Sequence, residues 1–339
     1  MKNLLTSILL IAISPLMAQS NPDSAAAYFK KGQAEAAERK WLTANQHFEK
    51  AIEFDAQMAD AYLANAVVLK EMRKITKVKE NYEKLYALQP QHPEAIRELM
   101  ELNYNYRRFD DAIAFANKCK DCPSASRIIG MSYYHQEDYG AAEKYLMDAI
   151  KKDPKDAEAT YTLARNYLDL EEYKKAVPWY EKAVNLPTAK NSWMYELGLL
   201  YYNNNDYSNA VLSFEKAAAN GYETKNDFNE NLGFASLYSG QYEKGEQLLT
   251  AVLKRKPNNK TLIRDMSEIF YGQKQYDKSL VYCQMLMELD PNDGKALYQA
   301  GLNFQKKGQK DRGQQMCDKA IEMDPSLNSL RTKKEMVGL

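Results

Sequence analysis

The stretch Pro123–Asp156 carries the pattern that decides the fold. Its small and apolar residues stand at fixed offsets, as Ser126-x-x-Ile129-Gly130-x-x-Tyr133, then Ala142-x-x-x-Leu146-x-x-Ala149, then Pro154. The same offsets return in register in the next stretch, as Leu163-Ala164-x-x-Tyr167 and Ala176-x-x-x-Tyr180-x-x-Ala183, and again as Leu197-Gly198-x-x-Tyr201 and Ala210-x-x-x-Phe214-x-x-Ala217. Recurrence at one fixed period indicates an internal repeat.

Each repeat contains two segments with apolar residues at three- and four-residue spacing, which is typical of two amphipathic helices. Pro154, Pro257 and Pro291 end the second segment, because proline lacks an N–H and restrains the residue before it. The pattern resembles the tetratricopeptide repeat, a helix–turn–helix unit of about 34 residues. This resemblance implies an all-α fold: an α-solenoid of about nine helix–turn–helix repeats that forms a right-handed superhelix.

The repeats fill residues 25–327, with residues 21–24 as a short linker before them and residues 328–339 as a C-terminal tail or capping helix. The third unit, residues 93–122, is four residues short. An apolar residue opens the second helix in eight units, and Lys310 in the ninth indicates a more polar terminal unit. These opening residues are Trp41, Ile75, Phe109, Tyr139, Tyr173, Tyr207, Tyr242, Tyr276 and Lys310.

The charge balance excludes one class of partner. Lys plus Arg and Asp plus Glu both number 46, and no Lys/Arg-rich block interrupts the repeats. The chain therefore has neither a global nor a local field that would attract nucleic acid.

The first twenty residues have the features of a secretory signal peptide. Lys2 precedes an apolar run from Leu4 to Ile13, and Pro15 is followed by the small residues Ala18 and Ser20. The run is about half of the roughly 20 residues that a membrane-spanning helix needs. We expect cleavage after residue 18 or 20, no transmembrane segment in the mature chain, and export to the periplasm or an outer-membrane-associated location, as in exported bacterial proteins of this repeat family.

Catalytic motifs are missing from the sequence. Its three His (His47, His92 and His135) form no metal-ligand spacing, and there is no HExxH, GxSxG, P-loop or GxGxxG motif. We therefore expect no enzymatic activity, no cofactor and no metal.

Cys119-x-x-Cys122 is the arrangement with redox or metal potential. A thioredoxin-like site needs a βαβ context and a zinc site needs a second pair, and the sequence offers neither. The two residues lie where the third unit loses four residues, and an oxidising compartment permits a local disulfide. A disulfide and free thiols both remain open. Cys283 and Cys317 occupy the buried aromatic position of adjacent repeats and are expected to act as small apolar side chains.

The resemblance also implies a binding surface, since in this family the first helices line the concave face that contacts ligands. The family's contact offsets, placed on this sequence, select aromatic and arginine residues, which are enriched at binding hot spots. The selected residues are Arg97, Tyr104, Arg127, Tyr134, Tyr161, Arg165, Tyr195, Tyr202, Phe234, Tyr238, Arg264 and Tyr271.

One form of the family binds an acidic C-terminal motif with a set of Lys, Asn and Arg. Asn105 and Asn203 stand in suitable places, but the matching lysines are missing. That function is therefore not expected here.

These observations favour a non-catalytic scaffold that binds a protein or peptide of unknown identity in its concave groove, in the cell envelope. Two alternatives stay open. The chain could be a redox or metal-handling protein that uses Cys119 and Cys122, or a periplasmic chaperone for outer-membrane or secreted proteins.

The signal peptide generates a testable prediction. The mature chain should begin near Gln19 or Asn21 and fractionate as a soluble protein, because the apolar run is too short to remain in the bilayer. N-terminal sequencing of the protein from its native host checks this. Recovery of Met1 in an envelope extract would contradict it.

Overall fold

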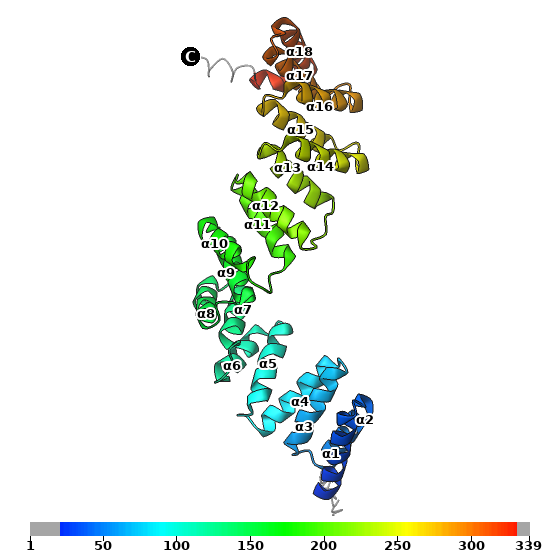
Figure 1. Ribbon diagram of the computed structural model, residues 1–339, viewed down its shortest axis with the longest axis vertical. Helices are drawn as coiled ribbons and strands as arrows, with labels where there is room; N and C mark the ends of the chain where they lie inside the picture. Colours follow the sequence, from blue (N-terminus) through cyan, green and yellow to red (C-terminus); the bar gives the residue numbers. More distant parts are fainter. Residues whose placement is uncertain (1–20, 331–339) are drawn as a thin grey trace, which may run out of the picture. The chain divides into compact units, whose positions relative to one another are not determined.

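The computed structural model describes residues 21–330, in which helices joined by short turns and loops are present and no strand occurs. The chain divides into two compact units, residues 1–166 and 167–339, which are described separately. Within each unit, consecutive helices pack as antiparallel pairs and each pair stacks on the next (Figure 1). The expected all-α solenoid is confirmed. The predicted signal peptide, residues 1–20, and the end of the tail, residues 331–339, lie outside the described residues.

The helices of the first unit are α1 (Pro22–Ala37), α2 (Trp41–Phe54), α3 (Ala59–Glu71), α4 (Ile75–Leu88), α5 (Pro93–Asn105), α6 (Phe109–Lys118), α7 (Ala125–His135) and α8 (Tyr139–Lys152). The boundary between the units falls inside α9 (Ala157–Asp169). The helices of the second unit are α10 (Tyr173–Ala183), α11 (Asn191–Asn203), α12 (Tyr207–Ala219), α13 (Asn226–Tyr238), α14 (Tyr242–Arg255), α15 (Lys260–Gly272), α16 (Tyr276–Leu289), α17 (Gly294–Lys306) and α18 (Lys310–Met323). A 3-10 turn, η1 (Pro325–Leu327), follows.

The sequence predicted the start of every second helix. Each even-numbered helix begins at the residue singled out above, from Trp41 in α2 to Lys310 in α18. The predicted ends also hold, since α8, α14 and α16 stop two residues before Pro154, Pro257 and Pro291. Both boundaries are local consequences of the sequence, which is why they could be read from it.

The turn inside each of the nine described pairs has one recurring conformation. The residue two before the second helix has a positive φ, as in Glu137 (62°) and Asn205 (61°), and in two pairs it is Gly240 or Gly308. The next N–H donates back across the turn to the first helix, for example from Asp138 to the carbonyl of Tyr133 at 3.0 Å. This is a Schellman ending, which satisfies carbonyls that the helix itself leaves free.

The two helices of a pair approach most closely where a small residue meets a large one. A Cβ on Gly32 would lie 2.6 Å from the ring of Phe48, and a Cβ on Gly198 would lie 2.6 Å from the ring of Phe214. Gly130, Gly233 and Gly301 are in the same relation to Leu146, Leu249 and Cys317. The partner is always 16 residues further along the chain. These glycines therefore permit the close approach of the two helices.

In two pairs, the side chains at this contact have different sizes from those in the glycine-containing pairs. In the third pair the large residue is on the first helix, where Met100 packs in one cluster with Ala116. In the eighth pair both residues are of medium size, and the Ser267 hydroxyl lies 3.1 Å from the buried Cys283 thiol. The total volume is thus kept while its distribution between the helices changes, as dense packing requires. Cys283 and Cys317 are buried, as expected.

The structure differs from expectation at residues 21–24, which were predicted to be a linker. Helix α1 begins at Pro22, because the side chain of Asn21 caps it by accepting a hydrogen bond from the N–H of Ser24 (3.1 Å). Proline at the first helical position reinforces this start, since its fixed φ suits a helix. At the other end, residues 328–330 are helical and Leu327 is buried in a cluster with Tyr298.

The small-to-large contact predicts a double-mutant cycle. Gly198→Met should destabilise the protein by about 1–3 kcal/mol through overpacking against Phe214, and Phe214→Ala by about 3–5 kcal/mol through the cavity it leaves. The double mutant should lose less than the sum, because Met100 and Ala116 already realise that arrangement. Urea unfolding followed by circular dichroism measures all three changes. Strict additivity would show that the two side chains do not share one contact.

Candidate binding face on the first helices

All twelve predicted contact residues lie on first helices. Arg97 and Tyr104 belong to α5, Arg127 and Tyr134 to α7, Tyr161 and Arg165 to α9, Tyr195 and Tyr202 to α11, Phe234 and Tyr238 to α13, and Arg264 and Tyr271 to α15. Arg97 and Tyr238 are exposed, and the other ten are half-buried. Half-burial leaves a side chain with both packing partners and a free surface.

In the second unit, five of these residues line two neighbouring pockets. The larger pocket, of about 790 Å³, is lined by Arg264, Ser267, Glu268, Tyr271, Leu286, Lys295, Ala296, Tyr298, Gln299, Leu302, Ser326, Leu327, Ser329 and Leu330. The smaller pocket, of about 330 Å³, is lined by Tyr202, Phe234, Tyr238, Asp265, Glu268, Ile269, Gly272 and Gln273. Glu268 borders both. We call the larger one the apolar pocket and the smaller one the acidic pocket.

Three tyrosines are grouped beside the acidic pocket. The rings of Tyr207 and Tyr238 stack at 4.6 Å, and Tyr202 meets Tyr207 edge-on at 5.4 Å. Burial raises the pKa of Tyr202 to about 12, helped by the neighbouring Tyr238 and Tyr207. The Tyr202 hydroxyl is therefore neutral near pH 7 and able to donate a hydrogen bond.

Two of the predicted arginines are bound within the chain. Arg264 donates to the carboxylate of Asp293 at 2.6 Å, and Arg127 forms an ion pair with Asp156 at 3.6 Å. Asp293 and Asp156 each cap the first helix of the following repeat, since their side chains accept from the N–H groups of Ala296 and Ala159. Each of these two arginines, which were selected as partner contacts, thus links one repeat to the next within the chain.

In the first unit the predicted residues join an aromatic group. The ring of His135 stacks on Phe109 at 5.0 Å, and its Nε2 lies 3.3 Å from the Tyr104 hydroxyl. Burial, together with Arg107, lowers the pKa of His135, so this imidazole is neutral near pH 7. In α9, Arg165 donates to the Tyr161 hydroxyl at 3.4 Å.

Tyr195 has a mainly structural position. Its ring stacks on Tyr222 at 4.6 Å and packs near Phe214 and Phe228, and its hydroxyl accepts from Asn231 at 2.7 Å. Burial raises the pKa of Tyr195. The ring therefore fills the contact between α11 and α13 more than it offers a free surface.

The sequence did not single out Asp265 or Lys295 as contact residues. Asp265 directly follows Arg264, and Glu268 occupies the first-helix position that Phe234 holds one repeat earlier. The repeat offset alone could have pointed to Glu268. An acidic residue on a helix gave no reason to prefer it over a solvated one.

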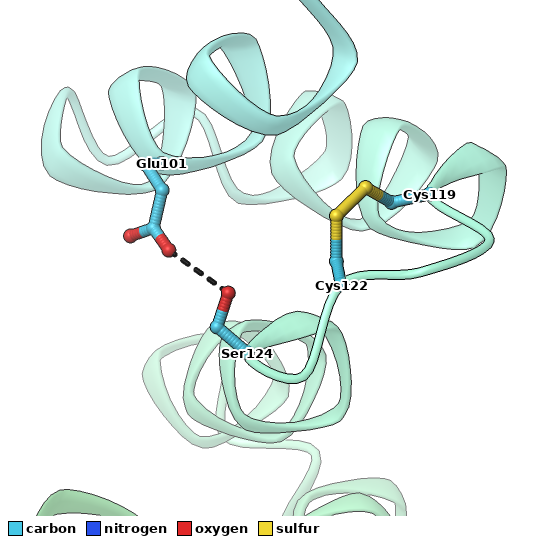
Figure 2. Close-up of a disulfide and its surroundings, with 4 residues drawn as sticks. All are labelled: Glu101, Cys119, Cys122 and Ser124. Carbon is cyan, nitrogen blue, oxygen red and sulfur yellow. Dashed lines mark hydrogen bonds between the residues drawn. A yellow bond between two sulfur atoms is a disulfide. The ribbon is translucent and has the colours of Figure 1, made fainter. Parts of the chain in front are cut away.

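Cys119 and Cys122 form a disulfide in the loop between α6 and α7, which Figure 2 shows beside the hydrogen bond that Ser124 donates to Glu101 (3.1 Å). Helix α6 has 10 residues, whereas α4 and α8 have 14, so the missing four residues shorten this helix. Cys122 packs against the cluster that contains Met100 and Ile128. The disulfide therefore lies where the last turn of the second helix is missing.

Among residues 21–330, no three His, Cys, Asp or Glu side chains gather closely enough to hold a metal ion. Over the same residues, no helix combines the length and the apolar character needed to cross a membrane.

The role of Arg264 can be tested. Arg264→Ala should destabilise the second unit by about 1–3 kcal/mol, because Asp293, whose side chain is only 8% exposed, would keep a charge without its counterion. Arg97→Ala, at an exposed arginine of the first unit, should stay within about 0.5 kcal/mol of wild type. Urea unfolding and hydrogen exchange at the start of α17 report the difference. If the two variants were equally stable, Arg264 would not stabilise the contact between the two repeats.

Comparison with known proteins agrees with the repeat geometry. Models of the tetratricopeptide repeat match residues 129–191, and residues 194–219 and 294–327. Two curated human proteins are similar over part of the chain. Protein O-mannosyl-transferase TMTC1 is 27% identical over 139 residues, 41% of this chain and 16% of that protein. Protein O-mannosyl-transferase TMTC3 is 26% identical over 183 residues, 53% of this chain and 17% of that protein. The chain thus spans less than a fifth of the length of these relatives.

Solved structures with a similar fold include YrrB, described as a TPR protein with an unusual peptide-binding site. It is 25% identical with a TM-score of 0.41, over 56% of this chain and 97% of that one. The C-terminal part of a TPR repeat-containing protein from Cytophaga hutchinsonii is 19% identical with a TM-score of 0.45, over 68% of this chain and 95% of that one. The matched residues, together with the helix pairs described above, show that the chain contains tetratricopeptide repeats.

Proposed function

We propose that the chain is a non-catalytic scaffold that binds a protein or peptide segment on the first helices of its second unit. One observation carries this proposal: Tyr202, Phe234, Tyr238, Arg264 and Tyr271, chosen from the repeat offsets alone, line two pockets that share Glu268. Pockets of several hundred Å³ with apolar walls and a few polar groups are where ligands bind in proteins.

The apolar pocket suits one side chain of a bound peptide segment together with the adjoining peptide backbone. Leu286, Leu302 and Leu327 provide apolar contact area, and Tyr271 and Tyr298 add aromatic rings. The side-chain nitrogen of Gln299 is buried and has no hydrogen-bond acceptor within the described part of the chain. A buried donor without an acceptor is unfavourable. A backbone carbonyl of a bound segment would supply that acceptor.

We assign no reaction to this surface. Of the serines lining the apolar pocket, Ser267 is already engaged with Ser279 and Cys283, and it lies next to no His in the pocket wall. Catalysis by a hydroxyl nucleophile needs an adjacent base. The lining groups instead resemble those of binding interfaces, where Tyr and Arg are enriched.

The place of action that we propose is the cell envelope, as in exported bacterial proteins. The support is the signal-like pattern of residues 1–20 together with the Cys119–Cys122 disulfide, because disulfides persist in oxidising compartments. The position of the disulfide at the shortened end of α6 favours a structural role for it over redox exchange. A chaperone for unfolded exported chains would share the same surface but would bind without sequence preference.

The binding test uses a phage-displayed library of random dodecapeptides, selected on the purified chain. Enriched peptides should share a sequence pattern, and their affinity for the chain should be measurable by fluorescence anisotropy of the labelled peptide. Replacing Tyr202 and Tyr271 with Ala, one from each pocket, should weaken binding about a hundredfold, because central aromatic residues carry most interface energy.

Two control variants separate this surface from the rest of the molecule. Tyr173→Ala, at an exposed tyrosine on the second helix α10, and the Cys119→Ser, Cys122→Ser double variant should bind as wild type does. Circular dichroism confirms that each variant is folded. If the pocket variant binds normally, or only the cysteine variant loses binding, the proposal fails. Enrichment without any shared pattern would favour the chaperone.

A further inference from the structure

We propose that the acidic pocket accepts an arginine or lysine side chain of the bound segment. This inference rests on the proposed function, because it names the chemistry of the partner at one of the same two pockets. Asp265 and Glu268 would pair with the cation, while the rings of Tyr202, Phe234 and Tyr238 surround it.

The two carboxylates have no partner of their own. Within residues 21–330, neither Asp265 nor Glu268 forms a hydrogen bond or an ion pair, although Asp265 is half-buried. Comparable half-buried carboxylates in this unit are paired: Asp293 binds Arg264, and Glu246 binds Lys278 and Tyr282. A partly desolvated charge without a counterion is unfavourable. An incoming cation would relieve this cost.

Among residues 21–330, no Lys or Arg side chain lines the acidic pocket. Arg264 is next to Asp265 in sequence, but its guanidinium is held by Asp293 at 2.6 Å. Burial raises the pKa of Asp265, and the charge of the neighbouring Arg264 only partly opposes this shift. The direction of the shift agrees with a carboxylate that has lost water without gaining a full ion pair. The pocket wall therefore presents two acidic groups and no basic one.

The aromatic walls favour the same ligand. A guanidinium or ammonium group within about 6 Å of an aromatic ring is attracted by its negative face, and arginine is the more frequent partner. Tyr238 is 39% exposed even though its ring stacks on Tyr207, so the tyrosine is available to a ligand. The volume of about 330 Å³ is at the lower end for small-molecule sites and suits one side chain.

This preference is opposite in sign to recognition of an acidic terminus, for which the sequence lacked the matching lysines. An acidic segment would place like charge against Asp265 and Glu268, and such contacts exclude wrong partners. The charge of the pocket thus predicts which segments are rejected as well as which are bound.

The test measures the charge preference on both sides of the contact. Peptides enriched on the purified chain should contain Arg or Lys, and replacing that residue by citrulline or norleucine should weaken binding at least tenfold. Asp265→Asn with Glu268→Gln should cause a similar loss and reduce the salt dependence of binding, since it removes the charge interaction that salt screens. Glu243→Gln with Glu322→Gln, which changes net charge equally at exposed sites outside the pocket, should leave binding unchanged.

Each outcome decides the matter. Peptides that bind without any basic residue, or that bind the Asp265, Glu268 variant as tightly as wild type, overturn the inference and leave the proposed function intact. Equal losses in both carboxylate variants mean that only long-range charge acts, which also overturns it. If no peptide binds the wild-type chain, the proposed function itself fails. Should the pocket variant unfold, the citrulline peptide on the wild-type chain still tests the contact.

Discussion

The structure depends on one close contact in each helix pair, between residues 16 positions apart whose sizes are complementary; in most pairs the first helix supplies the small residue and the second the large one. Gly198 under Phe214 shows why: no Cβ fits between them, so the helix backbones can approach until the ring fills the space. A single pair cannot bury both of its apolar sides, so neighbouring pairs must stack. The contact therefore determines the shape of one helix pair, and repetition of the pair determines the fold.

The links between repeats impose a second constraint, and it limits which residues are free for binding. Arg264 reaches the aspartate that caps the next first helix, and Arg127 does the same in the other unit. Their side chains are therefore used to hold neighbouring first helices together. In the second unit, the candidate binding face is therefore left mainly with aromatic rings and the carboxylates of Asp265 and Glu268.

The candidate site forms because first helices of successive repeats lie side by side. Tyr202, Tyr238 and Asp265 come from three different repeats, and each would be an ordinary half-exposed helix residue alone. Brought together, they make a pocket whose walls are aromatic and whose charge is negative. Such a surface can discriminate partners by charge without any moving part or cofactor.

The sequence by itself determined the repeat, because its pattern recurs about every 34 residues, and the helix boundaries, because they follow from residues close by in the chain. Trp41 and Lys310 begin their helices where the pattern placed them, whereas Asn21 showed that a capping residue can extend a helix into an expected linker. Only the tertiary structure decided how the first-helix residues are used. It pairs Arg264 with Asp293, packs Tyr195 against Phe228 and places Asp265 beside Tyr202, and each of these contacts joins residues from different repeats.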